Sequence, residues 1–71
     1  MARSCSDHAL HVDRHGDHWD VVDQDGRVIA HRHSQAEAIA LAIHQAQAMP
    51  EDVAVCVEQP DGHYSLAWPP R

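Results

Sequence analysis

The chain has 71 residues, enough for one small domain, and its formal net charge of −6 comes from eleven acidic and five basic residues. All the basic residues are scattered arginines, which disfavours binding to a nucleic-acid backbone or to an anionic membrane surface. No apolar run of about 18 residues or more is present, so the sequence predicts no membrane-spanning helix. The first residues lack the apolar stretch of a signal peptide, and we therefore expect a cytoplasmic protein.

The N-terminal part of the chain predicts a tail followed by a strand. We expect residues 1–7 to be a disordered tail and residues 8–71 to form a single α+β domain. Residues 8–14 alternate, with Leu10 and Val12 on one side. This period of two is typical of a half-buried strand.

Two further strands are predicted before the middle of the chain. Residues 18–23 alternate in the same way, and residues 27–33 form a weaker third strand. Turns at 15–17 and 24–26 separate them, and the Asp-Gly pair in the second turn is a strong hairpin signal. The chain therefore opens with three strands joined by short turns.

Residues 34–49 are predicted to be the only helix. Ser34 and Glu37 have the spacing of a capping box, in which the serine hydroxyl accepts the backbone N–H three residues on. Pro50 ends the helix because proline lacks an N–H and restricts the residue before it. The predicted apolar stripe has the i, i+3, i+4, i+7 spacing and consists of Ile39, Ala42, Ile43 and Ala46.

The C-terminal part predicts two more strands, 53–58 and 63–68, around a turn at 59–62 that again contains Asp-Gly. The order β-β-β-α-β-β predicts an α+β fold in which one helix packs on one face of an antiparallel sheet. The expected inner face of that sheet carries Leu10, Val12, Trp19, Val21, Val53, Val55, Val57, Leu66 and Trp68.

The two cysteines, Cys5 and Cys56, are far apart and lack the CxxC spacing of a redox or zinc motif. In a reducing cytoplasm we expect both to be free thiols.

Several motifs together resemble a small bacterial family, domain-of-unknown-function family 2188. They are His11-Val12, Gly16 with Trp19 and Val21, Ser34 with Glu37-Ala38 followed by Ala42 and Ala46, Val53 with Val55, and Asp61-Gly62. In this chain Trp19 lies three residues after Gly16, one residue later than in the Gly-x-Trp pattern of the family, and the lysines of the family are missing. The resemblance implies a compact fold of strands and one helix, and it implies no activity.

Eight histidines are the unusual feature of the composition. The spacing of His8, His11, His15 and His18 would align four imidazoles on a helix, but the alternation around them favours strands. On strands, the favoured interpretation is a solvated polar sheet face. The alternative is a surface cluster of imidazoles and carboxylates that binds Zn²⁺, Ni²⁺ or Cu²⁺ weakly. The candidate metal ligands are His11, His18, Asp20 and His31.

Catalysis is not expected, because no GxSxG elbow, HExxH motif or glycine-rich phosphate loop is present. The leading prediction is a non-enzymatic domain that acts through protein association, with a homodimer as one form. The metal-binding module is the alternative, and a nucleic-acid-binding accessory domain is the third. The candidate interaction residues are Leu41, on the helix side away from the stripe, and Val22 and Cys56, on the sheet face away from the helix.

Overall fold

The computed structural model describes Cys5 and residues 9–69. The predicted N-terminal tail lies outside the described residues apart from Cys5, and so does His8. Five strands and one helix follow one another in the predicted order. Their bounds are β1 Leu10–His15, β2 His18–Val22, β3 Val28–Arg32, α1 Gln35–Ala48, β4 Val55–Glu58 and β5 Tyr64–Trp68.

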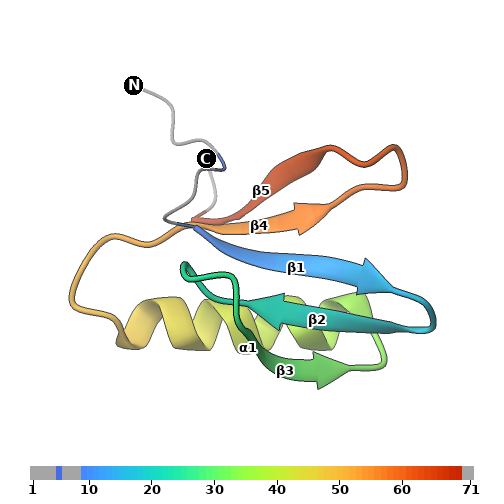
Figure 1. Ribbon diagram of the computed structural model, residues 1–71. Helices are drawn as coiled ribbons and strands as arrows, with labels where there is room; N and C mark the ends of the chain where they lie inside the picture. Colours follow the sequence, from blue (N-terminus) through green and yellow to red (C-terminus); the bar gives the residue numbers. More distant parts are fainter. Residues whose placement is uncertain (1–4, 6–8, 70–71) are drawn as a thin grey trace.

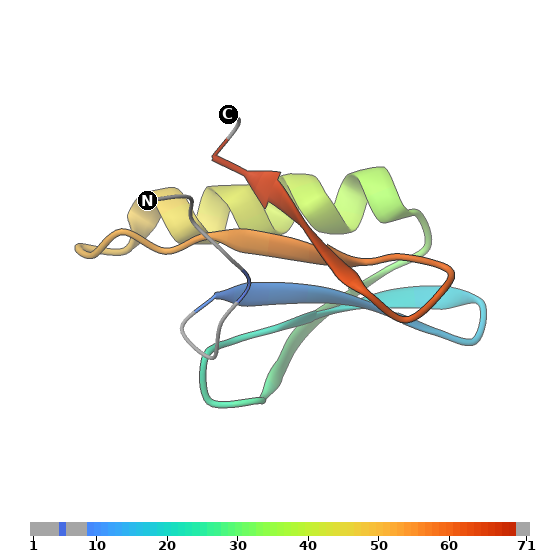
Figure 2. The ribbon, with the colours of Figure 1, turned by 90° about the horizontal axis from the view of Figure 1, so that it is seen from above.

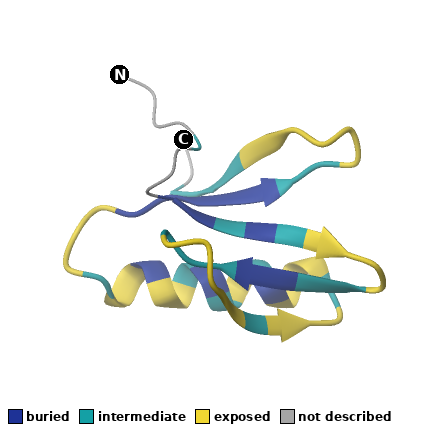
Figure 3. Ribbon diagram, viewed as in Figure 1, coloured by how far each residue is buried: buried dark blue, intermediate teal, exposed yellow. Residues whose placement is uncertain are grey.

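The strands form one sheet in the order β3-β2-β1-β4-β5, and α1 lies across one of its faces (Figures 1 and 2). The fold class is therefore α+β, with the helix packed against β1, β2, β3 and β4. The most buried segments are in the three central strands, whereas β3, at one edge, is mostly exposed (Figure 3).

The sheet is mixed, and the prediction of a purely antiparallel sheet is wrong for one pair of strands. β1 and β4 run parallel, with Leu10 opposite Val55, while the other three pairs are antiparallel. The helix is the reason. It carries the chain back along the sheet from the end of β3, so that β4 starts at the same side as β1 (Figure 1). Parallel neighbours need a long crossover of this kind.

The helix has the predicted ends. The Ser34 hydroxyl accepts a hydrogen bond from the backbone N–H of Glu37 at 3.1 Å. The Ser34 hydroxyl also lies 3.2 Å from a Glu37 carboxylate oxygen. The last helical residue is Ala48, two residues before Pro50.

The helix face that packs on the sheet consists of alanines. Its buried residues are Ala38, Ala42 and Ala46, spaced four apart. Ile43 and Leu41 are only half-buried, and each lies about 100° from the middle of this alanine row at about 100° per residue. Leu41 packs against the core on one side of the alanine row, and Ile43 packs against it on the other. The predicted stripe is therefore rotated, because small residues let the helix approach the sheet closely.

The predicted inner sheet face is correct except at Leu66. The core under the helix contains Leu10, Val12, Val21, Val53, Val55 and Val57, with Trp19 and Trp68 packed against it. Leu66 instead packs on the opposite face against Cys56. The register between β4 and β5 shifts between Val55 and Cys56. This irregularity breaks the simple alternation, so that Trp68 lies on the helix side while Leu66 does not.

The two cysteines form a disulfide, and the expectation of free thiols is wrong. The Cys5–Cys56 bond joins positions 51 residues apart. Together with Ala9, Ala54 and Leu66 the two cysteines form a second small apolar cluster on the face away from the helix. Disulfides persist in oxidising compartments, so the expectation of a reducing cytoplasm loses support.

Candidate metal centre

The sheet face away from the helix carries a row of ionisable side chains on its first three strands. His11 lies opposite Val22, Asp13 opposite Asp20, and His15 opposite His18 across β1 and β2. Because side chains alternate along a strand, every second residue of each strand contributes to this face. On β3, His31 lies next to Asp20. The sheet register thus collects imidazoles and carboxylates from three strands.

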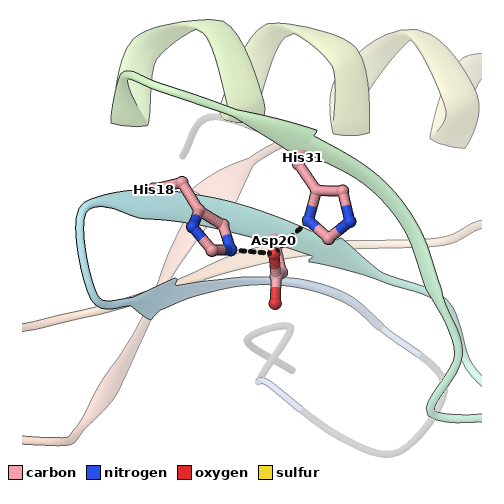
Figure 4. A group of neighbouring side chains, drawn as sticks. All are labelled: His18, Asp20 and His31. Carbon is pink, nitrogen blue, oxygen red and sulfur yellow. Dashed lines mark hydrogen bonds and ion pairs between the residues drawn. The ribbon is translucent and has the colours of Figure 1, made fainter.

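Asp20 lies at the centre of this row and contacts two imidazoles. Its Oδ1 lies 2.6 Å from Nδ1 of His31 and 3.1 Å from Nε2 of His18. Figure 4 shows the two rings on either side of the carboxylate, one from β2 and one from β3. The Asp20 side chain is only 12% exposed, whereas that of His31 is 66% exposed. The carboxylate is therefore at the bottom of the cluster and the imidazoles form its rim.

The surroundings of Asp20 favour the ionised carboxylate. Burial alone would raise its pKa, but the His31 hydrogen bond and the charges of His18, His31 and His15, when protonated, outweigh that effect. The net result is a pKa below the usual value for aspartate. A nearly buried carboxylate that keeps its negative charge attracts a cation.

The three side chains offer grouped donor atoms of the kinds that bind transition-metal ions. One ligand atom from each of His18, Asp20 and His31 lies within 4.8 Å of the other two. Ligands about 2.1 Å from a metal are roughly 3.0–3.4 Å from one another, as follows from metal–ligand distances in zinc sites. The His18–Asp20 contact of 3.1 Å falls in this range, whereas the His31–Asp20 contact of 2.6 Å is shorter, so the side chains would have to move apart slightly to hold an ion.

His11, the fourth predicted ligand, is not part of this group. Its ring packs edge-on against Tyr64, with ring centroids 4.9 Å apart. The Tyr64 hydroxyl in turn donates a hydrogen bond to Asp13 at 2.6 Å. Tyr64 is 41% exposed, and the partial burial of its phenol, followed by the hydrogen bond to Asp13, raises its pKa. Sequence patterns did not reveal this second cluster, because Tyr64 and Asp13 are 51 residues apart and their strands are not neighbours in the sheet.

Two more histidines lie close to the candidate site. The ring centroid of His15 is 5.4 Å from that of His18. His33 lines a hollow of about 250 Å³ together with His18, His31 and Arg32. His15 is one of the four regularly spaced imidazoles but not one of the predicted ligands, although its position opposite His18 follows from the hairpin.

The three candidate interaction residues do not form one surface. Leu41 is half-buried and packs against the core under the helix. Val22 is half-buried and lines a hollow of about 330 Å³ beside Tyr64. Cys56 is fully buried in the disulfide.

Exposed apolar side chains are found elsewhere, on the edge strand β3. Val28 is 48% exposed and Ile29 is 42% exposed. They are adjacent residues at one edge of the sheet.

Comparisons of the chain with protein-family models, with curated proteins and with solved structures found no match. The resemblance to family 2188 therefore stays a prediction. In the part of the chain that the structure describes, no helix has the length and apolar character that crossing a membrane requires.

Proposed function

We propose that this domain binds a divalent transition-metal ion, such as Zn²⁺ or Ni²⁺, through His18, Asp20 and His31. The observation that carries the proposal is the convergence of two imidazole nitrogens on one oxygen of a nearly buried carboxylate. Imidazole and carboxylate are established ligands for these ions, and histidine suits both zinc and nickel.

The position of the cluster suggests what the metal would do for the chain. His18 and Asp20 are on β2 and His31 is on the edge strand β3. A metal bound between them would tie the exposed edge strand to the body of the sheet. A domain this small has a thin core, for which a metal is a common reinforcement. Ligand binding to the native state alone stabilises it by about 2.7 kcal/mol at a free concentration 100 times the dissociation constant.

The test is a titration of the purified, oxidised chain with Zn²⁺, followed by calorimetry and native mass spectrometry. We expect one equivalent per chain in the native protein. His18→Ala and His31→Ala should each weaken binding at least about tenfold, since even the loss of a residue that only hydrogen-bonds to a metal ligand costs about 10–100-fold.

His63→Ala is the matched control for these variants. His63 and Asp61 form an imidazole–carboxylate pair at 2.8 Å, also exposed, with no third metal ligand grouped with them among the described residues. The control should bind Zn²⁺ like the native chain. The proposed site is wrong if the native chain takes up no stoichiometric Zn²⁺. It is also wrong if His18→Ala and His31→Ala bind Zn²⁺ with the same affinity as the control His63→Ala.

A second candidate function, association with another copy of the chain, is supported by the edge strand β3. Its neighbouring Val28 and Ile29 are 48% and 42% exposed. An edge strand offers backbone donors and acceptors for pairing with another strand, and exposed apolar side chains add burial on association. We expect a homodimer through β3.

Sedimentation velocity over a range of protein concentrations tests this association. Ile29→Lys should shift the chain to the monomer, because a buried lysine at the edge opposes strand pairing. Ala40→Lys, on the exposed side of the helix, is the control and should leave the dimer intact. A native chain that sediments as a monomer at every concentration would exclude this candidate.

A further inference from the structure

The register of the first hairpin adds a fourth imidazole to the candidate metal centre. His15 and His18 are directly opposite each other at the end of β1 and the start of β2. Only Gly16 and Asp17 separate them, and Gly16 has a positive φ of 68° that lets the chain turn within two residues. Side chains opposite each other on an antiparallel pair lie on the same face, with Cβ atoms about 5 Å apart.

His15 lies close enough to reach the cluster. Its ring centroid is 5.4 Å from that of His18, which itself contacts Asp20. His15 does not belong to the group of donors that lie within 4.8 Å of one another. Its side chain is exposed, however, so a rotation about its side-chain bonds costs little.

We infer that His15 is the fourth protein ligand, which makes the site a closed His₃Asp centre rather than a three-ligand site with an open position. This inference rests on the proposed function and specifies its class. Structural zinc sites have four protein ligands, whereas catalytic sites keep a position for water or substrate. With His15 bound, the metal clips the tip of the β1–β2 hairpin to β3, and no coordination position remains for a substrate.

The arrangement explains why three donors lie within six residues. His15, His18 and Asp20 follow one another at spacings of three and two, across a two-residue turn and along one strand face. The turn brings His15 over His18, and the strand period of two puts His18 and Asp20 on the same side. His31 then approaches from the neighbouring strand. One hairpin and one edge strand thus supply the whole ligand set.

The experiment uses Co²⁺ as the probe, because its visible spectrum reports coordination number and the identity of the ligands. The intact oxidised chain, His15→Ala, His15→Gln and His33→Ala are titrated with Co²⁺, and each complex is then exposed to imidazole. His33→Ala is the matched control, since His33 lies beside His18 and His31 but is not assigned as a ligand. Circular dichroism verifies that every variant is folded.

We expect the native chain and His33→Ala to give the same four-coordinate spectrum, which imidazole does not change. Both His15 variants should bind Co²⁺ at least about tenfold more weakly, and added imidazole should restore a native-like spectrum by filling the vacated position. If the His15 variants bind like the native chain, or if imidazole alters the native spectrum, the fourth-ligand assignment is overturned while the three-ligand site stands. If the native chain binds no Co²⁺, the proposed function itself fails.

Discussion

Asp13 and Asp20 lie directly opposite each other on β1 and β2, yet their carboxylates have different partners. Like charges at opposite positions of an antiparallel pair destabilise it. Here Tyr64, on β5, donates a hydrogen bond to Asp13. His18, on β2, and His31, on β3, contact Asp20 on the same face. Each carboxylate thus has its own polar partners. The outer face divides into the candidate metal centre and a tyrosine cluster, which consists of His11, Asp13 and Tyr64.

Titration of Tyr64 tests the first of these clusters. The chain contains one tyrosine, so tyrosinate absorbance in the near ultraviolet reports this group alone. Burial and the hydrogen bond to Asp13 raise the pKa of Tyr64, and we expect a midpoint above the ordinary value of about 10. Asp13→Asn should lower that midpoint, because it removes the negative charge beside the phenol.

The same shift determines the sign of a stability effect. The folded-state pKa of Tyr64 is above its unfolded value, so the contribution to stability is complete below about pH 10. It is lost as the pH rises through the folded-state pKa. A midpoint for the folded native chain equal to that of the chain in denaturant would contradict the expectation.

Reduction of the disulfide should destabilise the domain strongly. The Cys5–Cys56 bond closes a loop with a sequence separation of 51, and the loop-entropy relation gives a stabilisation on the order of 4 kcal/mol. Urea unfolding followed by fluorescence of the two tryptophans, with and without a reductant, measures the change.

Cys5→Ser is the genetic counterpart of this experiment and should unfold at the same urea concentration with or without reductant. Only the native chain should unfold at a lower urea concentration when the reductant is added. Unchanged unfolding of the native chain on reduction would show that the bond contributes nothing to stability.

Ala42→Leu tests the close approach of the helix to the sheet. Ala42 is fully buried in the row that faces the strands, and added methylene groups in a well-packed core cost roughly 1–3 kcal/mol. Ala40→Leu is the control on the exposed side of the same helix. It should change the free energy of unfolding by less than about 0.5 kcal/mol. Equal effects of the two substitutions would mean that the helix does not pack through its alanines.

Leu10 and Ile43 allow a comparison of central and flanking core positions. Leu10 is fully buried on the central strand β1, and Leu10→Ala should cost roughly 2–5 kcal/mol. Ile43 is half-buried at the side of the alanine row, so Ile43→Ala should cost clearly less. Thermal or chemical unfolding of the two variants shows which substitution lowers the free energy of unfolding more. The reverse order would place Ile43, rather than the alanines, at the centre of the interface.

Local patterns were sufficient for much of the fold. The alternation of Leu10 and Val12, the cap at Ser34 and the stop at Pro50 act within a few residues, so the strands, the helix and their order along the chain were predictable. The same alternation put His18, Asp20 and His31 on the outer face. Three of the four predicted ligands therefore come together in the structure.

The tertiary structure decided what depends on contacts between distant segments. The parallel pairing of β1 with β4 follows from the path of the helix, and the Cys5–Cys56 bond depends on where that pairing brings residue 56. His11 belongs to the tyrosine cluster because only one strand, β4, lies between β1 and β5, so that the Tyr64 ring on β5 reaches the His11 ring on β1. Periodicity determines which face a side chain occupies, but only the pairing of the strands determines which neighbours it meets there.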